Sequence, residues 1–421
     1  MLKYRPDIDG LRAIAVMPVV LFHAGVPIAK GGYIGVDVFF VVSGFLITSI
    51  IVRELEKSEF SLLRFYERRA RRILPALLFM VAVTLIAGTF LLLPNALSRL
   101  GESVIATALF GSNFYFWRSL DYFSLAAEYA PMLHTWSLAV EEQFYIFFPL
   151  LLMAIYALSL RKWLRTLLVV MTLGSLGLAI VAVELRPLGA FYLLPFRAWE
   201  LGLGAMLATF SLTAVRSSAL REGLTMIGLI GILAPVFFYT PTTPFPGLAA
   251  VPPVVGTAIL IGLGSQRNMV AKLLSTKPFV AVGLISYSLY LWHWPILALM
   301  RANKLSPKLS LTESAFAIML SFALAWISYE FIEKPVRKHK IFKDRRQILT
   351  MSAVSLSAFA VVGAALHLTK GLPQRLPADA LRAEASMGDI NPYRTSCMGR
   401  TPDAGLCVIG DGLDSFVTSG S

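Results

Sequence analysis

Two ionisable residues, Arg12 and His23, lie in the first long apolar segment of the chain, DGLRAIAVMPVVLFHAGV (residues 9–26). They are eleven positions apart, and eleven helical steps of ~100° return to within about 20° of the same face. A helix would therefore place both side chains on one stripe, about 16 Å apart along its axis. Ionisable side chains inside membrane spans are costly and indicate function. The alternatives are that Arg12 extends to the membrane surface and that His23 makes a structural hydrogen bond to a neighbouring helix.

Three carboxylates are expected at the depth of His23. Asp37 lies near the start of GGYIGVDVFFVVSGFLI, and Glu141 and Glu142 lie about one turn into HTWSLAVEEQFYIFFPL. If both segments enter from the outer side, the three acids converge on His23. A carboxylate beside an imidazole orients the ring and raises its basicity, so the cluster predicts a general base that deprotonates a hydroxyl. The alternative for the two glutamates is a capped helix start, with Ser137 as the N-cap.

Four arginines follow one another in the run FYERRARRILPA: Arg68, Arg69, Arg71 and Arg72. Guanidinium groups at a spacing of three suit bidentate phosphate binding, although a simple charged membrane anchor is the alternative for any one of them. Together with Arg12 they predict an anion site at the inner mouth. The ligand would carry phosphate at the cytoplasmic end and react at the outer end, as coenzyme A with its pantetheine arm could.

The composition identifies a membrane protein, and its charge distribution predicts an orientation. Of 421 residues, 57% are hydrophobic and 15% charged, and the mean hydropathy is +0.70. The net charge of +13 does not indicate a nucleic-acid partner, because Lys and Arg concentrate in loops 53–72 and 334–346, which are predicted to be cytoplasmic. The N-terminus is then predicted to be cytoplasmic, and the chain beyond residue 370 to be exported. The N-terminal segment is not expected to be a cleavable signal.

Eleven segments have the length and apolarity of membrane spans. Residues 95–136 between the third and fourth contain an aromatic cluster at 114–117 and favour an interfacial or re-entrant segment over a twelfth span. We therefore expect an all-α polytopic protein with about ten bundle helices and an eleventh, linking transmembrane helix. The predicted spans are residues 9–27, 34–52, 73–94, 137–158, 163–184, 189–210, 222–239, 247–264, 281–301, 313–333 and 347–369.

The remaining candidates are more isolated. Cys397 and Cys407 are the two cysteines, both in the polar tail, so no metal cluster is predicted; an exported disulfide is expected, with two free thiols as the alternative. His293 is interpreted as a packing residue in the cytoplasmic half of its span. His134 is a weaker candidate for touching the acceptor, and Arg197 with Glu200, one turn apart, predicts a buried ion pair.

Several motifs together resemble the membrane-bound acyltransferase-3 family of bacterial O-acyltransferases, over about residues 4–340. The resemblance implies that His23 is catalytic and that Arg12 belongs to the same motif. It places the family's Arg-x-x-Arg motif on Arg69 and Arg72 and its Ser-Leu-x-x-Glu-Glu motif on residues 137–142. The motifs are YRPDIDGLRAIAV, GGYIGVDVFFVVSGFLI, RRARR, TWSLAVEEQFY and ISYSLYLWHWPI.

The span at 347–369 resembles a subgroup in which the membrane domain (1–346) continues into an exported SGNH hydrolase-like domain. The segment 370–421 would be the linker to that domain, and we expect the chain to stop before its nucleophile block, because Gly410-Asp411-Gly412 lacks the serine.

The resemblance implies a multi-pass enzyme of the bacterial inner membrane, surrounded by membrane lipids, that moves acetyl groups from cytoplasmic acetyl-CoA to an envelope polysaccharide. The acceptor, free or lipid-linked, would be lipopolysaccharide O-antigen first and peptidoglycan next. A transporter or flippase of lipid-linked saccharides is the alternative, although no internal repeat supports it. A membrane scaffold acting through its tail is a third interpretation.

Overall fold

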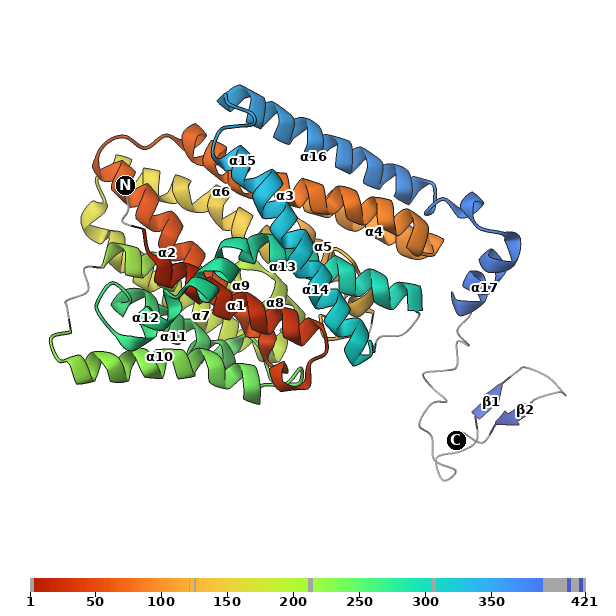
Figure 1. The fold of residues 1–421 in the computed structure, drawn as a ribbon, viewed down its shortest axis with the longest axis horizontal. Helices are drawn as coiled ribbons and strands as arrows, with labels where there is room; N and C mark the ends of the chain where they lie inside the picture. Colours follow the sequence, from red (N-terminus) through yellow and green to blue (C-terminus); the bar gives the residue numbers. More distant parts are fainter. Residues whose placement is uncertain are drawn as a thin grey trace.

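The computed structural model describes residues 4–120, 122–124, 126–210, 215–304, 308–388, 407–409 and 416–418. The described chain is a helical assembly followed by a two-stranded antiparallel hairpin (Figure 1). The first half contains α1 (Pro6–His23), η1 (Pro27–Ala29), η2 (Gly32–Ile34), α2 (Gly35–Glu56), α3 (Leu62–Leu91), α4 (Pro94–Ala108), α5 (Ser112–Ser119), η3 (Ala127–Tyr129), α6 (Thr135–Ala157), η4 (Arg161–Trp163), α7 (Leu164–Leu185), α8 (Pro187–Tyr192) and α9 (Leu194–Thr209). The second half contains α10 (Ser218–Phe238), η5 (Gly247–Ala250), α11 (Val251–Leu263), α12 (Met269–Leu274), α13 (Lys277–Lys304), α14 (Leu311–Ile327), the π-helical η6 (Ser328–Glu333), α15 (Lys334–Arg337), α16 (Arg345–Leu368), η7 (Pro373–Arg375), α17 (Ala378–Gly388), β1 (Cys407–Ile409) and β2 (Phe416–Thr418).

Each of the eleven predicted spans falls on a helix. Within the described residues, eight helices are long and apolar enough to cross a membrane, which confirms a polytopic all-α membrane protein. The other three predicted spans correspond to α1, to α8 with α9, and to η5 with α11. The segment 189–210 is not one helix, because Leu193 is extended and Pro195 favours a new helix start.

The segment between α3 and α6 forms two short helices rather than one span. α4 has 15 residues and α5 has 8. At ~1.5 Å per residue, α4 is about 22 Å long, short of the ~30 Å hydrocarbon core. Phe110, with φ of 53°, separates the two helices in a left-handed conformation. The interfacial position of the aromatic cluster on α5 remains a prediction.

Glycines let the central helices approach closely. A Cβ built on Gly283 of α13 would lie 1.8 Å from the Asp9 carbonyl oxygen of α1, and one on Gly44 of α2 would lie 1.9 Å from the Leu201 carbonyl oxygen of α9. Such small-residue contacts are a main source of packing energy between helices in lipid. These glycines bring α13 against α1 and α9 against α2, and α1 also packs against α2. The contacts position the candidate site.

The last long helix, α16, lies at the periphery, where it packs along α4 and α3 (Figure 1). It corresponds to the predicted linking helix at 347–369. Beyond it lie α17 and the hairpin, in which Cys407 pairs with Thr418. The predicted disulfide cannot be placed, since Cys397 and the side chain of Cys407 lie outside the described part of the chain.

Candidate functional site

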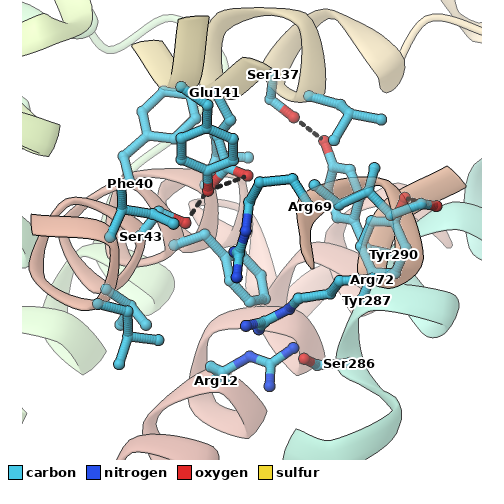
Figure 2. Close-up of a pocket in the computed structure, with 18 residues that line it drawn as sticks. Arg12, Phe40, Ser43, Arg69, Arg72, Ser137, Glu141, Ser286, Tyr287 and Tyr290 are labelled. Atoms are coloured by element: carbon cyan, nitrogen blue, oxygen red, sulfur yellow. Dashed lines mark hydrogen bonds between the residues drawn. The ribbon is translucent and has the colours of Figure 1, made fainter. Parts of the chain in front are cut away.

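A cavity between α1, α2, α3, α6 and α13 contains three of the predicted arginines. Its volume is about 810 Å³, counting its open mouth. Figure 2 shows the side chains of Arg12, Arg69 and Arg72 near one another among the residues that line it. Among the described residues, no carboxylate forms an ion pair with Arg69 or Arg72, while Arg12 contacts Asp9 at 3.4 Å. The cavity therefore carries excess positive charge suited to an anionic ligand.

The other two predicted anion-binding residues, Arg68 and Arg71, do not line this cavity. Arg68 pairs with Glu54 at 3.0 Å, and Arg71 pairs with Glu67 at 3.0 Å and donates to the carbonyl oxygens of Phe342 and Lys343. Adjacent residues on a helix point ~100° apart, so two interleaved Arg-x-x-Arg pairs cannot face one cavity. Arg68 thus links α3 to α2, and Arg71 links α3 to the segment before α16.

The two glutamates of α6, Glu141 and Glu142, also point in different directions, and only Glu141 lines the cavity. Glu141 lines the cavity and accepts hydrogen bonds from Ser43 at 2.7 Å and Tyr145 at 3.4 Å (Figure 2). Glu142 is buried, and its Oε1 atom has no hydrogen-bond partner among the described residues. The N-cap alternative for Ser137 is wrong: α6 begins at Thr135, and the Ser137 hydroxyl lies 2.6 Å from the Tyr290 hydroxyl.

Asp37 does not bond to His23 as predicted. Its carboxylate accepts from Arg197 at 3.0 Å, and Arg197 also pairs with Glu200 at 2.8 Å. All three side chains are buried, and the guanidinium contacts four aromatic rings. The predicted Arg197–Glu200 ion pair is confirmed, and Asp37 is its third member because a buried guanidinium requires compensating charge.

His23 bonds instead to a second histidine and a tyrosine. Its Nδ1 atom lies 2.9 Å from Nε2 of His293, and its Nε2 atom lies 2.8 Å from the hydroxyl of Tyr122. The planes of the two imidazole rings are nearly parallel, at 15°, and their centroids lie 5.1 Å apart. The interpretation of His293 as a packing residue is therefore wrong, and no carboxylate is among the hydrogen-bond partners of His23 in the described structure.

The hydrogen bonds of His293 determine which nitrogen of His23 is free to act as a base. Nδ1 of His293 lies 2.6 Å from the Tyr290 carbonyl oxygen. A carbonyl only accepts, so in neutral rings this nitrogen carries the proton and Nε2 of His293 accepts from Nδ1 of His23. Nε2 of His23 is then unprotonated and accepts from Tyr122. Burial raises the pKa of the Tyr122 hydroxyl, which keeps it protonated as a donor.

Tyr290 contacts both the cavity and His293, and a third histidine, His134, lies near His293. Tyr290 lines the cavity, and its hydroxyl donates to the His134 carbonyl at 2.9 Å. The His134 ring is buried, with its centroid 6.0 Å from that of His293. Neither nitrogen of this ring lies in hydrogen-bonding geometry with a described residue. The end of α1 is also fixed, because Arg301 donates to the His23 carbonyl at 2.5 Å and pairs with Glu128 at 3.2 Å.

The partners of His23 were missed for different reasons. The sequence did mark His293, because it is an ionisable residue inside the apolar segment YSLYLWHWP, and such residues within a span indicate function. Tyr122 lies between α5 and η3, outside any periodic segment, and nothing in its local sequence marks it.

Among the described residues, no group of three or more His, Cys, Asp or Glu side chains is placed to hold a metal ion.

These features define a polytopic helical membrane protein with a hydrogen-bonded histidine pair and a cationic cavity, in which Tyr290 lines the cavity and its carbonyl oxygen bonds to His293. A family model described as "Acyltransferase domain" matches residues 5–330. The chain therefore belongs to the membrane-bound acyltransferase-3 family.

Two curated relatives illustrate the similarity. O-acetyltransferase OatA of Staphylococcus aureus (strain NCTC 8325 / PS 47) is 34% identical over 350 residues, which is 80% of this chain and 58% of the relative. Peptidoglycan O-acetyltransferase OatA of Listeria monocytogenes serovar 1/2a is 33% identical over 378 residues, covering 82% of this chain and 59% of the relative. The chain thus matches less than two thirds of these relatives' length. No solved structure matches it.

Proposed function

We propose that this protein is an inner-membrane O-acetyltransferase that moves an acetyl group from cytoplasmic acetyl-CoA to a hydroxyl of an envelope polysaccharide. The observation that carries the proposal is the hydrogen-bonded series Tyr290 carbonyl, His293, His23 and Tyr122 hydroxyl, in which a base is both oriented and bonded to a hydroxyl.

The donor would enter with its phosphates on Arg12, Arg69 and Arg72. These three guanidinium groups line the cavity and would bind phosphate oxygens in the forked geometry that arginine provides. The pantetheine arm would occupy the apolar part of the cavity, which includes Val36, Phe39 and Leu46. Arg12 lies about 16 Å along α1 from His23, so an extended donor suits the distance between the two groups.

The acyl transfer would start at the Tyr122 hydroxyl. Nε2 of His23 takes the hydroxyl proton as the oxygen attacks the thioester carbon, forming the C–O bond. The C–S bond breaks, and His23 returns the proton to the thiolate sulfur. A second attack by an acceptor hydroxyl, with the same base removing its proton, then moves the acyl group from Tyr122 to the acceptor and restores the tyrosine.

The relatives support the proposed class of acceptor. The two OatA relatives are named as O-acetyltransferases, one of them of peptidoglycan, and this favours a peptidoglycan acceptor over the O-antigen acceptor expected first from the sequence. We propose the predicted orientation, with a cytoplasmic N-terminus and an exported tail that links the membrane domain to an SGNH-type domain.

The test uses acetyl-CoA labelled in the acetyl group, in inside-out vesicles that contain the protein. We expect transfer of label to envelope polysaccharide, its loss in His23→Ala and Tyr122→Phe, and acetyl-protein accumulation in wild type when acceptor is withheld. His339→Ala, at an exposed loop histidine, is the matched control. Unchanged transfer in His23→Ala would refute the assigned base. Saccharide movement without any acetyl transfer would favour the flippase alternative.

A further inference from the structure

A second cavity, here called the basic chamber, lies where α2, α6 and α9 end and α7 begins. Its volume is about 1430 Å³, counting its open mouth. It shares no lining residue with the cavity of Arg12, Arg69 and Arg72. The charged residues of its lining are the cations Arg53, Arg161, Lys162 and Arg165 and the single acid Glu56.

The four cations of the basic chamber exceed the single negative charge of Glu56 in its lining. Among the described residues, no carboxylate forms an ion pair with any of its four cations. Two of them are nevertheless positioned: Arg161 lies over the Tyr156 ring at 4.8 Å, and Arg165 donates to the Thr209 carbonyl at 3.1 Å. Cations held close together without a counter-charge create a site for a polyanionic or phosphate-bearing ligand.

A separate apolar groove lies further along α6, α7 and α9, three of the helices that line the basic chamber. It measures about 640 Å³ and begins at Leu168, one turn beyond Arg165 on α7. On α6 it extends to Phe144, twelve residues and about 18 Å from Tyr156 in the chamber. Half of a ~30 Å hydrocarbon core is ~15 Å, so chamber and groove together span about one leaflet. The groove is lined by Phe144, Phe147, Phe148, Leu151, Leu168, Met171, Thr172, Leu194, Ala198 and Gly202.

The groove has an exposed outer wall. Phe147 and Met171 are 63% and 50% exposed, and the spanning part of α7 is mostly exposed. A molecule in the surrounding bilayer could therefore enter from the side, with its charged end in the chamber and its chain in the groove. Clustered basic residues between membrane helices are a known means of binding anionic headgroups.

We propose that the basic chamber and the apolar groove together bind an anionic glycerophospholipid. Its phosphate contacts Arg53, Arg161 and Arg165, and one acyl chain lies in the groove between α6, α7 and α9. A phosphate ion would use the chamber alone, whereas the lipid uses both parts. The proposal is independent of the donor and acceptor assigned above.

The test measures lipids retained by the detergent-purified protein, by native mass spectrometry, after exchange into equal phosphatidylglycerol and phosphatidylcholine. We expect preferential retention of phosphatidylglycerol and at least about a tenfold loss in the triple variant Arg53→Gln, Arg161→Gln, Arg165→Gln. The triple variant Lys338→Gln, Lys340→Gln, Lys343→Gln removes the same charge from an exposed segment and serves as the matched control. Equal losses in the two variants would mean general surface attraction and overturn the site.

A second variant separates a lipid from a free anion. Ala198→Phe fills the groove without changing a charge, and we expect it to reduce phosphatidylglycerol retention while leaving inorganic pyrophosphate binding at the chamber unchanged. Full lipid retention in Ala198→Phe would show that no acyl chain occupies the groove, and the proposal would fail. A retained thermal unfolding midpoint in each variant confirms that the fold is intact.

Discussion

Nδ1 of His23 and Nε2 of His293 lie 2.9 Å apart, although the two residues are separated by 270 positions in the chain. This contact makes His293 a positioning residue, because its own Nδ1 is bonded to the Tyr290 carbonyl and its Nε2 can only accept. The orientation of the base therefore depends on α13 as much as on α1.

Removing His293 should lower turnover more than donor binding. In His293→Ala, Nδ1 of His23 loses its acceptor and the ring can adopt the other tautomer, so we expect kcat to fall about 10²-fold, within the range of a general-base contribution. KM for acetyl-CoA should change little. Steady-state kinetics of labelled transfer measures both. His293→Gln, whose amide oxygen can accept from His23, should recover part of kcat; no recovery together with a raised KM would contradict the positioning role.

The two arginine pairs of α3 should behave differently. Arg69→Gln or Arg72→Gln removes a cation from the cavity, and we expect KM for acetyl-CoA to rise at least about tenfold, because a charge-assisted hydrogen bond contributes about 1.5–3 kcal/mol. Arg68→Gln is the matched control, since that side chain pairs with Glu54 outside the cavity. An equal rise in KM for Arg68→Gln would argue for a diffuse surface effect rather than a defined phosphate site.

Asp37 should matter for stability rather than for catalysis. Asp37→Ala leaves Arg197 with one carboxylate in a fully buried cluster, and breaking a buried ion pair costs about 3–5 kcal/mol. The thermal unfolding midpoint in detergent should fall, while kcat per folded molecule stays near the wild-type value. A normal midpoint with lost kcat would return Asp37 to the catalytic role predicted from the sequence.

The glycine contact between α1 and α13 should tolerate no side chain. Gly283→Ala places a methyl group 1.8 Å from the Asp9 carbonyl oxygen, so the helices must separate and fewer molecules should fold. Size-exclusion yield and the unfolding midpoint report this loss. Gly174→Ala on α7, where the added Cβ meets nothing within 4 Å, should match wild type. Similar yields for the two variants would show that the α1–α13 approach is less restrictive than the structure indicates.

The sequence by itself determined the helical segments, because a membrane core requires long apolar segments and every predicted span contains helix, although 189–210 divides into α8 and α9. It also identified His23, Arg12 and the arginine cluster, because charges inside apolar segments stand out. Only the tertiary structure decided how these groups pair. The rotation of α3 about its axis turns Arg69 and Arg72, rather than Arg68 and Arg71, toward the cavity. The packing of α2 against α9 places Asp37 beside Arg197. His23 acquired His293 and Tyr122 because side-chain contacts between distant segments depend on which faces the helices bury, a property that periodicity within each segment does not specify.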